Sequence, residues 1–240
     1  MRTVVVTGGG KGIGRAVVAR LAAAGDRVIA VGRDGGALAE TADATGAAID
    51  VVDVTNEAAV ESFFAGVGAI DVLVLNAGVA SSAPLPKTTL ADWQAAHAVN
   101  ATGAFLCTRA ALPRLNEHGR IVTVASVSGR VGSKYTAAYV ASKHAAVGLT
   151  RATAAELAGT TKTANAVCPG YVRTEMTERT IANIEARTGR DGEAELAKLS
   201  PLNRLIEPDE VAFAVAFLAA PEAGAINGQT LILDGGGIQT

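Results

Sequence analysis

The sequence predicts a doubly wound α/β domain in which a seven-stranded parallel sheet carries helices on both faces. Short β-branched runs alternate with helical segments along the chain, and a glycine-rich turn directly follows the first run. Such alternation implies right-handed crossovers and therefore a parallel sheet covered on both sides. No linker, repeat or low-complexity stretch divides the 240 residues, of which 49% are hydrophobic. We expect a single domain spanning residues 1–240.

The first strand leads into a candidate phosphate-binding loop. An apolar run over residues 2–7 precedes Gly8-Gly9-Gly10-Lys11-Gly12-Ile13-Gly14, and residues 15–21 then form a good helix. Glycines permit a tight turn and close backbone approach, and the amino terminus of a helix attracts a pyrophosphate. Three consecutive glycines could instead form a flexible turn, but their position directly after the first strand favours the binding site. The candidate cofactor-binding residues of this loop are Gly8, Gly10, Lys11, Gly12, Ile13 and Gly14.

The remaining elements follow the same alternation. Further strands are predicted at 27–31, 47–52, 72–75, 121–124, 164–167 and 230–233. The longest helices are expected at 100–115 and 135–157, and another helix is expected to begin at Pro208. Because ligands bind at the carboxyl ends of the strands in open α/β sheets, we expect the functional site there.

Tyr139 and Lys143 form a candidate acid–base pair. Positions i and i+4 lie one above the other on a helix, so the ammonium can sit beneath the phenol. A phenol has an ordinary pKa near ~10, and a fixed positive charge beside it draws that pKa toward the neutral range. On its own, the pair is more typical of an amphipathic helix with a half-buried tyrosine and a solvated lysine.

A serine at the end of a buried strand strengthens the catalytic interpretation. Residues 119–126 form a β-branched run that ends in serine, which is typical of a buried parallel strand that delivers Ser126 at its carboxyl end. Ser128 could take the same role on composition alone.

Composition and charge argue against several other classes. The net charge of -2 comes without a basic stripe, which argues against a nucleic-acid partner. The best apolar run, residues 211–220, is far shorter than the ~18 residues of a membrane span. Met1-Arg2 leads straight into the first strand, so we expect neither a signal peptide nor a membrane partner.

The cysteines and histidines predict no metal site. Cys107 and Cys168 have no metal-ligand spacing and form no disulfide framework, so a reducing cytoplasm is expected. His97, His118 and His144 are scattered along the chain. We expect these residues to be structural or to lie at the surface.

Taken together, the motifs resemble those of the short-chain dehydrogenase/reductase family. They are Thr7-Gly8-x-x-x-Gly12-x-Gly14, Asn76-Ala77-Gly78, Asn100, Ser126, Tyr139-x-x-x-Lys143 and Pro169-Gly170-x-Val172-x-Thr174. The resemblance covers essentially the whole chain and implies a Rossmann fold that binds a dinucleotide. The chain departs from the usual family pattern at Leu75, where a second asparagine often stands, and at Ala125, where a serine often stands.

The resemblance also implies a role for each catalytic candidate. Tyr139 would be the acid/base, Ser126 would hydrogen-bond the substrate carbonyl, and Asn100 would hold a water in the proton relay. Lys143 would hold the nicotinamide ribose and lower the pKa of Tyr139. The separation of 13 residues between Ser126 and Tyr139 matches the family, which favours Ser126 over Ser128.

Further cofactor contacts are implied in the same way. Asn76, Ala77 and Gly78 would line the adenosine side and stabilise the central strands, and Asp53 and Val54 would flank the adenine. Pro169, Gly170, Val172 and Thr174 would hold the nicotinamide amide.

The end of the second strand bears on the choice of cofactor. Gly32-Arg33 places a neutral residue and a guanidinium where an NAD-selective site has an acid, which suits a 2'-phosphate. Lys11 adds a second cation on the same side. Alternatively, Arg33 pairs with Asp34 or solvent and Asp34 takes the ribose. NADP(H) is therefore the expected cofactor, with NAD(H) as the alternative.

The substrate is less well defined by the sequence. The resemblance makes residues 175–200 a substrate lid and implies a small-molecule carbonyl or alcohol, including thioester-linked ones, as in 3-oxoacyl reductases and ketoreductases. The expected reaction is NADPH-dependent reduction of a ketone to a secondary alcohol. NAD-dependent oxidation of a hydroxyacyl or secondary alcohol and a non-catalytic dinucleotide-binding protein are the alternatives. The family further implies a homotetramer.

Overall fold

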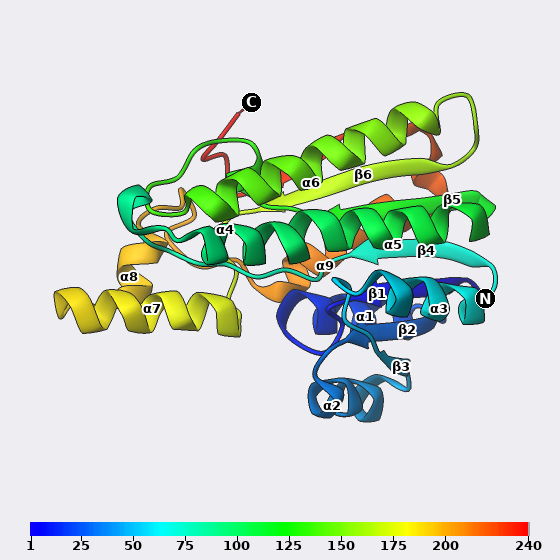
Figure 1. The fold of residues 1–240 in the computed structure, drawn as a ribbon, viewed down its shortest axis with the longest axis horizontal. Coiled ribbons are helices and arrows are strands. Elements are labelled where there is room, and N and C mark those ends of the chain that lie inside the picture. Colours follow the sequence, from blue (N-terminus) through cyan, green and yellow to red (C-terminus); the bar gives the residue numbers. More distant parts are fainter. Residues whose placement is uncertain (240) are drawn as a thin grey trace.

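A computed structural model describes residues 1–239, which contain seven parallel strands in the order β3-β2-β1-β4-β5-β6-β7 (Figure 1). The chain moves outward from β1 to β3 and then returns to place β4 on the other side of β1. This reversal is the switch point at which ligands bind in doubly wound sheets. The strands are β1 Thr3–Thr7, β2 Arg27–Gly32, β3 Ala48–Val51, β4 Ile70–Leu75, β5 Leu115–Val124, β6 Thr163–Pro169 and β7 Thr230–Leu233.

Nine α-helices join or flank these strands within the described residues. They are α1 Gly12–Ala23, α2 Gly35–Thr45, α3 Glu57–Val67, α4 Leu90–His97, α5 Ala104–Ala111, α6 Ala137–Glu156, α7 Glu175–Thr188, α8 Gly192–Ala197 and α9 Pro208–Ala219. A π-helical segment, Ala98–Gly103, connects α4 to α5.

Alternate residues of the central strands face opposite sides of the sheet and enter two separate cores. Val4 and Val6 of β1 pack with residues of α1 and α9, whereas Val5 packs with residues of α3 and α5. This period of two is the expected consequence of the strand pleat. Burial on both faces explains why these strands are continuously apolar rather than alternating.

The seven predicted strands and their parallel arrangement are confirmed, and the boundaries of one helix were wrong. The helix predicted at 100–115 is the later part of a helical stretch that begins at Leu90. It begins there because Thr89 and Asp92 form a capping box, in which each side chain bonds the other residue's backbone N–H. It ends in a single 3-10 turn, Leu112–Arg114, and Leu115 already belongs to β5.

The segment expected to form a lid folds as two helices at one end of the molecule. α7 and α8 lie beyond the carboxyl end of the sheet (Figure 1). Thr174 caps α7 and Asp191 caps α8 through their side-chain oxygens. In the part of the chain that the structure describes, no helix combines the length and apolarity needed to cross a membrane.

Candidate active site

The glycine loop between β1 and α1 has a backbone that only glycine accommodates. Gly8 and Gly12 have φ values of 67° and 49°, a region that other residues rarely adopt. A Cβ at Gly14 would lie 2.0 Å from the carbonyl oxygen of Gly8. The loop therefore stays free of side chains at the amino terminus of α1, and this cradle fits the pyrophosphate of a dinucleotide.

Hydrogen bonds between the ends of β1 and β4 fix the shape of this loop. The Thr7 hydroxyl oxygen accepts from the backbone N–H groups of Asn76 and Ala77, at 3.0 and 3.1 Å. The Asn76 amide in turn donates to the carbonyl oxygens of Thr7 and Gly8, at 3.0 and 3.1 Å. The structure thus places Asn76 and Ala77 directly at the switch point, where sequence reasoning located the cofactor site.

Asn100 lies in the π-helical segment and joins three parts of the site. Its amide Oδ1 accepts from the Val79 N–H at 2.8 Å, and its Nδ2 donates to the Val79 carbonyl oxygen and to the Ser142 hydroxyl, both at 2.9 Å. Ser142 donates to the carbonyl oxygen of Tyr139 at 2.8 Å. The asparagine therefore ties the segment after β4 to the turn of α6 that carries the tyrosine. Its expected role in holding a water stays a prediction.

Lys143 is buried in the same region. Its ammonium donates to the Val124 carbonyl oxygen at 2.9 Å and lies 5.8 Å from the centre of the Tyr139 ring. A Cβ added at Gly78 would lie 3.5 Å from the Lys143 nitrogen, so Gly78 leaves space beside it. Burial lowers the pKa of Lys143 to about 8, because the charged form loses solvation.

Tyr139 differs from expectation in the direction of its pKa. Burial raises the pKa of its phenol above the ordinary value, and a hydrogen bond from Ser126 opposes this only in part. The net shift is therefore opposite to the one expected from Lys143, and the lowering effect of Lys143 itself stays a prediction. Desolvation is the largest cause of this shift, although the side chain is only partly buried, and the ammonium is bonded to Val124.

Ser126 stands at the end of β5, next to Tyr139. Its hydroxyl oxygen accepts from the Ser128 N–H at 3.1 Å and starts a single 3-10 turn. Of the two candidate serines, Ser126 is the one whose side chain influences the Tyr139 phenol. Ser126, Tyr139, Lys143 and Asn100 therefore come together in one cluster, as the sequence predicted, with Tyr139 the partly exposed member of the four, although their catalytic roles remain predictions.

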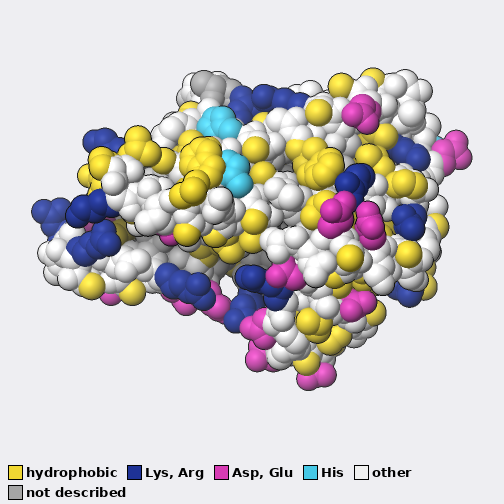
Figure 2. Space-filling view, in the orientation of Figure 1, with side chains coloured by type: hydrophobic (Ala, Val, Ile, Leu, Met, Phe, Trp, Pro, Cys, Tyr) yellow, Lys and Arg dark blue, Asp and Glu magenta, His cyan; other side chains and the backbone are white. Residues whose placement is uncertain are grey.

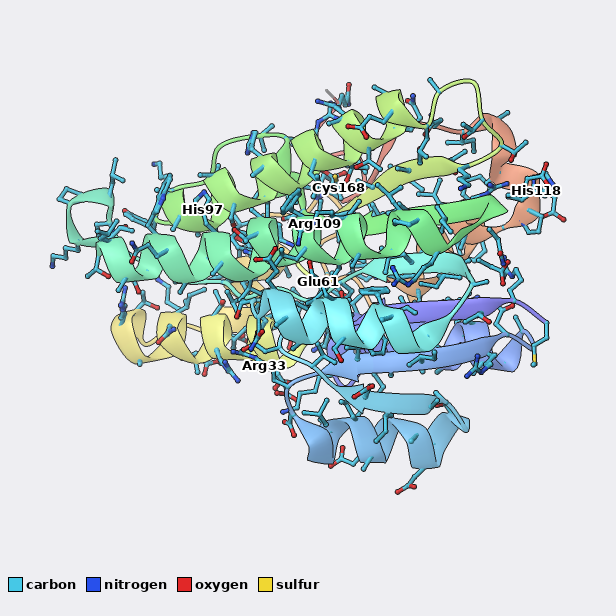
Figure 3. All side chains as sticks on the ribbon, turned by 45° about the vertical axis from the view of Figure 1, so that its right-hand side comes forward. Arg33, Glu61, His97, Arg109, His118 and Cys168 are labelled. Atoms are coloured by element: carbon cyan, nitrogen blue, oxygen red, sulfur yellow. The ribbon has the colours of Figure 1, made fainter. Side chains whose placement is uncertain are left out.

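On the adenosine side, charged residues surround the end of β2. The Arg33 guanidinium is largely exposed and lies 3.8 Å from the Asp53 carboxylate (Figure 3). Asp34 caps α2 by accepting from the Ala37 N–H, and its other oxygen lies 3.1 Å from the Lys11 ammonium. Asp34 thus pairs with Lys11 rather than with Arg33, which leaves the guanidinium accessible to an anion.

The remaining predicted cofactor residues contact neighbouring segments of the chain. Gly170 donates its backbone N–H to the Leu233 carbonyl oxygen at 2.9 Å, and Val172 forms a parallel bridge with Ile206. A Cβ at Gly12 would lie 3.1 Å from Thr174 Cγ2, so Thr174 closes against the glycine loop. Ile13 packs against one core but stays partly exposed, and the buried side chain of Val54 lies against Gly103.

Sequence reasoning missed two groups that hold the catalytic cluster. Ser142 is completely buried between Asn100 and Tyr139, and the backbone carbonyl of Val124 holds Lys143. The position of Ser142, three residues after Tyr139 and one before Lys143, was the available signal for the first. No sequence signal marks a carbonyl acceptor, because every strand residue carries one.

In residues 1–239 no histidine hydrogen-bonds to this cluster, whereas the Cys168 thiol lies within hydrogen-bonding reach of the Ser126 backbone. Among residues 1–239, no group of three or more His, Cys, Asp or Glu side chains is placed to hold a metal ion. Burial raises the pKa of both thiols, that of Cys107 to about 12. Cys168 is completely buried at the end of β6, close enough to contribute to the electrostatic environment of Tyr139.

Comparison with known proteins places the chain in a family. A family model described as enoyl-(acyl carrier protein) reductase matches residues 8–237. The chain is 40% identical to an acetoacetyl-CoA reductase of Shinella zoogloeoides, with 98% of each protein covered. It is 37% identical to a D-beta-hydroxybutyrate dehydrogenase of Cupriavidus necator, covering 98% of this chain and 97% of the relative.

A solved structure extends the similarity to three dimensions. A variant of actinorhodin polyketide ketoreductase, crystallised with NADPH, superposes with a TM-score of 0.91 at 34% identity, over 98% of this chain and 96% of the other. The chain therefore belongs to the short-chain dehydrogenase/reductase family. It is an oxidoreductase that uses a nicotinamide dinucleotide and interconverts carbonyl and alcohol groups.

Proposed function

We propose that this enzyme reduces a 3-oxoacyl thioester, or a ketone of polyketide type, to a secondary alcohol with NADPH. The observation that carries the proposal is the cluster of buried Ser126 and Lys143 with partly exposed Tyr139 beside the glycine loop. It offers two hydroxyl donors to one substrate oxygen and a cation behind them, which suits a carbonyl that becomes an alkoxide.

The chain's own residues perform the proton chemistry. Bound NADPH would lie along the glycine loop, with Tyr139 and Lys143 near its nicotinamide end, and would supply the hydride. The Ser126 hydroxyl donates to the carbonyl oxygen and polarises it, and the Tyr139 hydroxyl gives that oxygen its proton. The Lys143 ammonium then stabilises the phenolate that remains. Asn100 and Ser142 hold the turn that carries Tyr139.

The environment of Tyr139 suits it as the proton donor of the reduction. Because burial raises its pKa, the phenol is protonated at neutral pH and is ready to donate. Oxidation would need a phenolate to accept the proton. The similarity to a D-beta-hydroxybutyrate dehydrogenase keeps NAD-dependent oxidation as the second candidate function.

Preference for NADP(H) is proposed from the charges at the end of β2. Arg33 is exposed and Gly32 leaves the position of an NAD-selective acid empty. A guanidinium can bind a phosphate through two charge-assisted hydrogen bonds, each worth roughly 10- to 150-fold in affinity.

The test of cofactor preference is the ratio of kcat/KM for NADPH to that for NADH. We expect the wild type to favour NADPH, and the double variant Gly32→Asp with Arg33→Ser to shift the ratio toward NADH. A wild type that prefers NADH, or a ratio that the double variant leaves unchanged, would return NAD-dependent oxidation to first place.

The substrate class is proposed from the relatives and the lid. An acetoacetyl-CoA reductase acts, by its name, on a 3-oxoacyl thioester. Around the lid, Met176, Leu199 and Leu202 are partly or largely exposed and offer apolar contacts to an acyl chain. Acetoacetyl-CoA, a short 3-ketoester and an unactivated ketone, assayed with both cofactors, would distinguish the thioester from the general ketone.

We propose further that the chain has a substrate lid, assembles with copies of itself and acts in the cytoplasm. Residues 175–200 act as the substrate lid of a single domain, and four copies assemble into a homotetramer. The site of action is the cytoplasm. Apolar side chains exposed on α4 and α5, among them Trp93 and Phe105, support assembly through these helices.

A further inference from the structure

Lys11 connects the glycine loop to two other elements of the site. Its ammonium lies 3.1 Å from Asp34 Oδ2 and 3.4 Å from Glu175 Oε2. Asp34 caps α2, and Glu175 is the first residue of lid helix α7. One cation therefore joins the cofactor loop, the end of β2 and the lid.

The contact between the loop and the lid is close. A Cβ at Gly12 would lie 3.1 Å from Thr174 Cγ2, so the residue before α7 packs directly on the residue after Lys11. Basic and acidic side chains gather around the hollow between the lid and the β2–α2 region (Figure 2). The ion pair between Lys11 and Glu175 stands at this point of contact.

The two carboxylates around Lys11 are not held equally. Asp34 also accepts a hydrogen bond from the Ala37 N–H at the start of α2. Within the described residues, Glu175 has Lys11 as its one cationic partner. The group of three carries a net charge of about -1, and a 2'-phosphate adds about -1.5 to -2 more. The phosphate therefore repels both carboxylates. Glu175 is the less constrained of the two, so we expect its side chain to be the one that moves away from Lys11.

We propose that Glu175 tethers the lid helix to the glycine loop through Lys11, and that a 2'-phosphate releases this tether by competing for the same ammonium. The inference rests on the proposed function, since it needs a phosphate-bearing cofactor at Arg33 and Lys11. Under this proposal, Glu175 weakens binding of the 2'-phosphate. The attachment of the lid helix to the glycine loop then depends on whether the cofactor carries that phosphate.

A binding experiment without catalysis tests the competition. The probes are adenosine 2',5'-bisphosphate and 5'-AMP, which differ only in the 2'-phosphate, with dissociation constants measured by calorimetry. Glu175→Gln should tighten the bisphosphate about two- to fivefold, the range of an exposed ion pair, and leave 5'-AMP unchanged. The matched control is Glu178→Gln, which removes the same charge one turn further along α7. In a Lys11→Met background, Glu175→Gln should have a smaller effect, because no shared ammonium is left to compete for.

Hydrogen–deuterium exchange over residues 175–188 tests the tether. In the wild type, this peptide should exchange faster with the bisphosphate bound than with 5'-AMP bound. In Glu175→Gln, the two ligands should give the same exchange, because that variant has no tether to release.

Three results would overturn the inference. They are an unchanged bisphosphate affinity in Glu175→Gln, an equal gain in Glu178→Gln, and exchange that does not differ between the ligands in the wild type. A wild type that binds both probes equally would also refute the proposed NADP(H) preference. A clear wild-type preference with no effect of Glu175→Gln would refute the tether alone.

Discussion

At the scale of single residues, Tyr139 carries the most direct prediction. Removing its hydroxyl in Tyr139→Phe deletes the proton donor and keeps the ring that fills the site. We expect turnover to fall ~100- to 10,000-fold, the usual contribution of a general acid, with the dissociation constant for the cofactor nearly unchanged. Steady-state kinetics and fluorescence titration measure the two quantities. Retention of more than about a tenth of the wild-type rate would show that another group donates the proton.

Lys143 links the chemistry of the site to the stability of the fold. Its pKa is about 8 when folded, against about 10.4 for a free lysine, so the unfolded chain binds more protons between these values. The free energy of unfolding therefore rises with pH across this window. Below pH 8 the buried charge costs stability, on the order of 3 kcal/mol.

Lys143→Met should accordingly be inactive and more stable at neutral pH. We expect a gain of about 1 to 3 kcal/mol at pH 7, because the lost hydrogen bond to Val124 offsets part of the relief. The gain should shrink as the pH rises from 8 to 10.5. Urea unfolding at the two ends of this range measures it, with Lys87→Met as the control for loss of an exposed lysine. A variant less stable than the wild type at pH 7 would contradict the buried-charge argument.

At the scale of elements, the π-helical segment positions Asn100. Its last residue, Gly103, faces Val54 so closely that a Cβ would lie 2.8 Å from Val54 Cγ2. π-Helical turns occur often at functional sites, and here the turn holds Asn100 against Val79 and Ser142. The packing of this segment is therefore part of the geometry of the site.

Gly103→Ala tests this packing. Overpacking costs about 1 to 3 kcal/mol and exceeds the roughly 1 kcal/mol that alanine gains over glycine in a helix. We expect a net loss of stability and a lower kcat, because Asn100 moves with the segment. The matched control is Gly66→Ala in α3, where a Cβ meets nothing within 4 Å and should stabilise the protein. Equal stability of Gly103→Ala and Gly66→Ala in urea would mean that Val54 moves aside with no loss of stability.

The sequence predicted the helices and strands better than the positions at which they begin and end. Every strand followed from β-branched runs and the glycine turn, because a parallel sheet buried on both faces leaves that pattern. The start of α4 was missed although Thr89 and Asp92 form a capping box, since two local residues compete with a long apolar pattern further on. The π-helical turn was beyond sequence reasoning, because Gly103 and Val54 come together only in the folded chain.

The members of the catalytic cluster could also be predicted from sequence patterns, but the directions of their pKa shifts could not. Spacing along one helix brings Tyr139 and Lys143 together, and the end of a strand delivers Ser126. The direction of a pKa depends instead on how completely each group is enclosed. The Val124 carbonyl that holds the Lys143 ammonium comes from a strand 19 residues earlier in the chain. Spacing therefore predicts which groups meet, and burial decides their protonation.

At the scale of the whole molecule, exposed apolar side chains bear on assembly. Trp93 of α4 and Phe105 of α5 are 41% and 44% exposed, and hydrophobic groups gather over these helices (Figure 2). Aromatic side chains left partly in water are typical of interfaces between subunits. β7 is an edge strand of the sheet, with Leu231 partly exposed, and offers a second direction of contact.

The expected assembly is a tetramer of four 24.1 kDa chains. The double variant Trp93→Glu with Phe105→Glu should halve that mass, because burying two unpaired carboxylates at an interface costs far more than the lost contacts. Contacts around β7 would still hold pairs together. Sedimentation velocity at micromolar concentration measures both proteins, with Leu199→Glu on the exposed lid segment as the control. A monomeric wild type would refute the tetramer, and a double variant that remains tetrameric would move the interface away from α4 and α5.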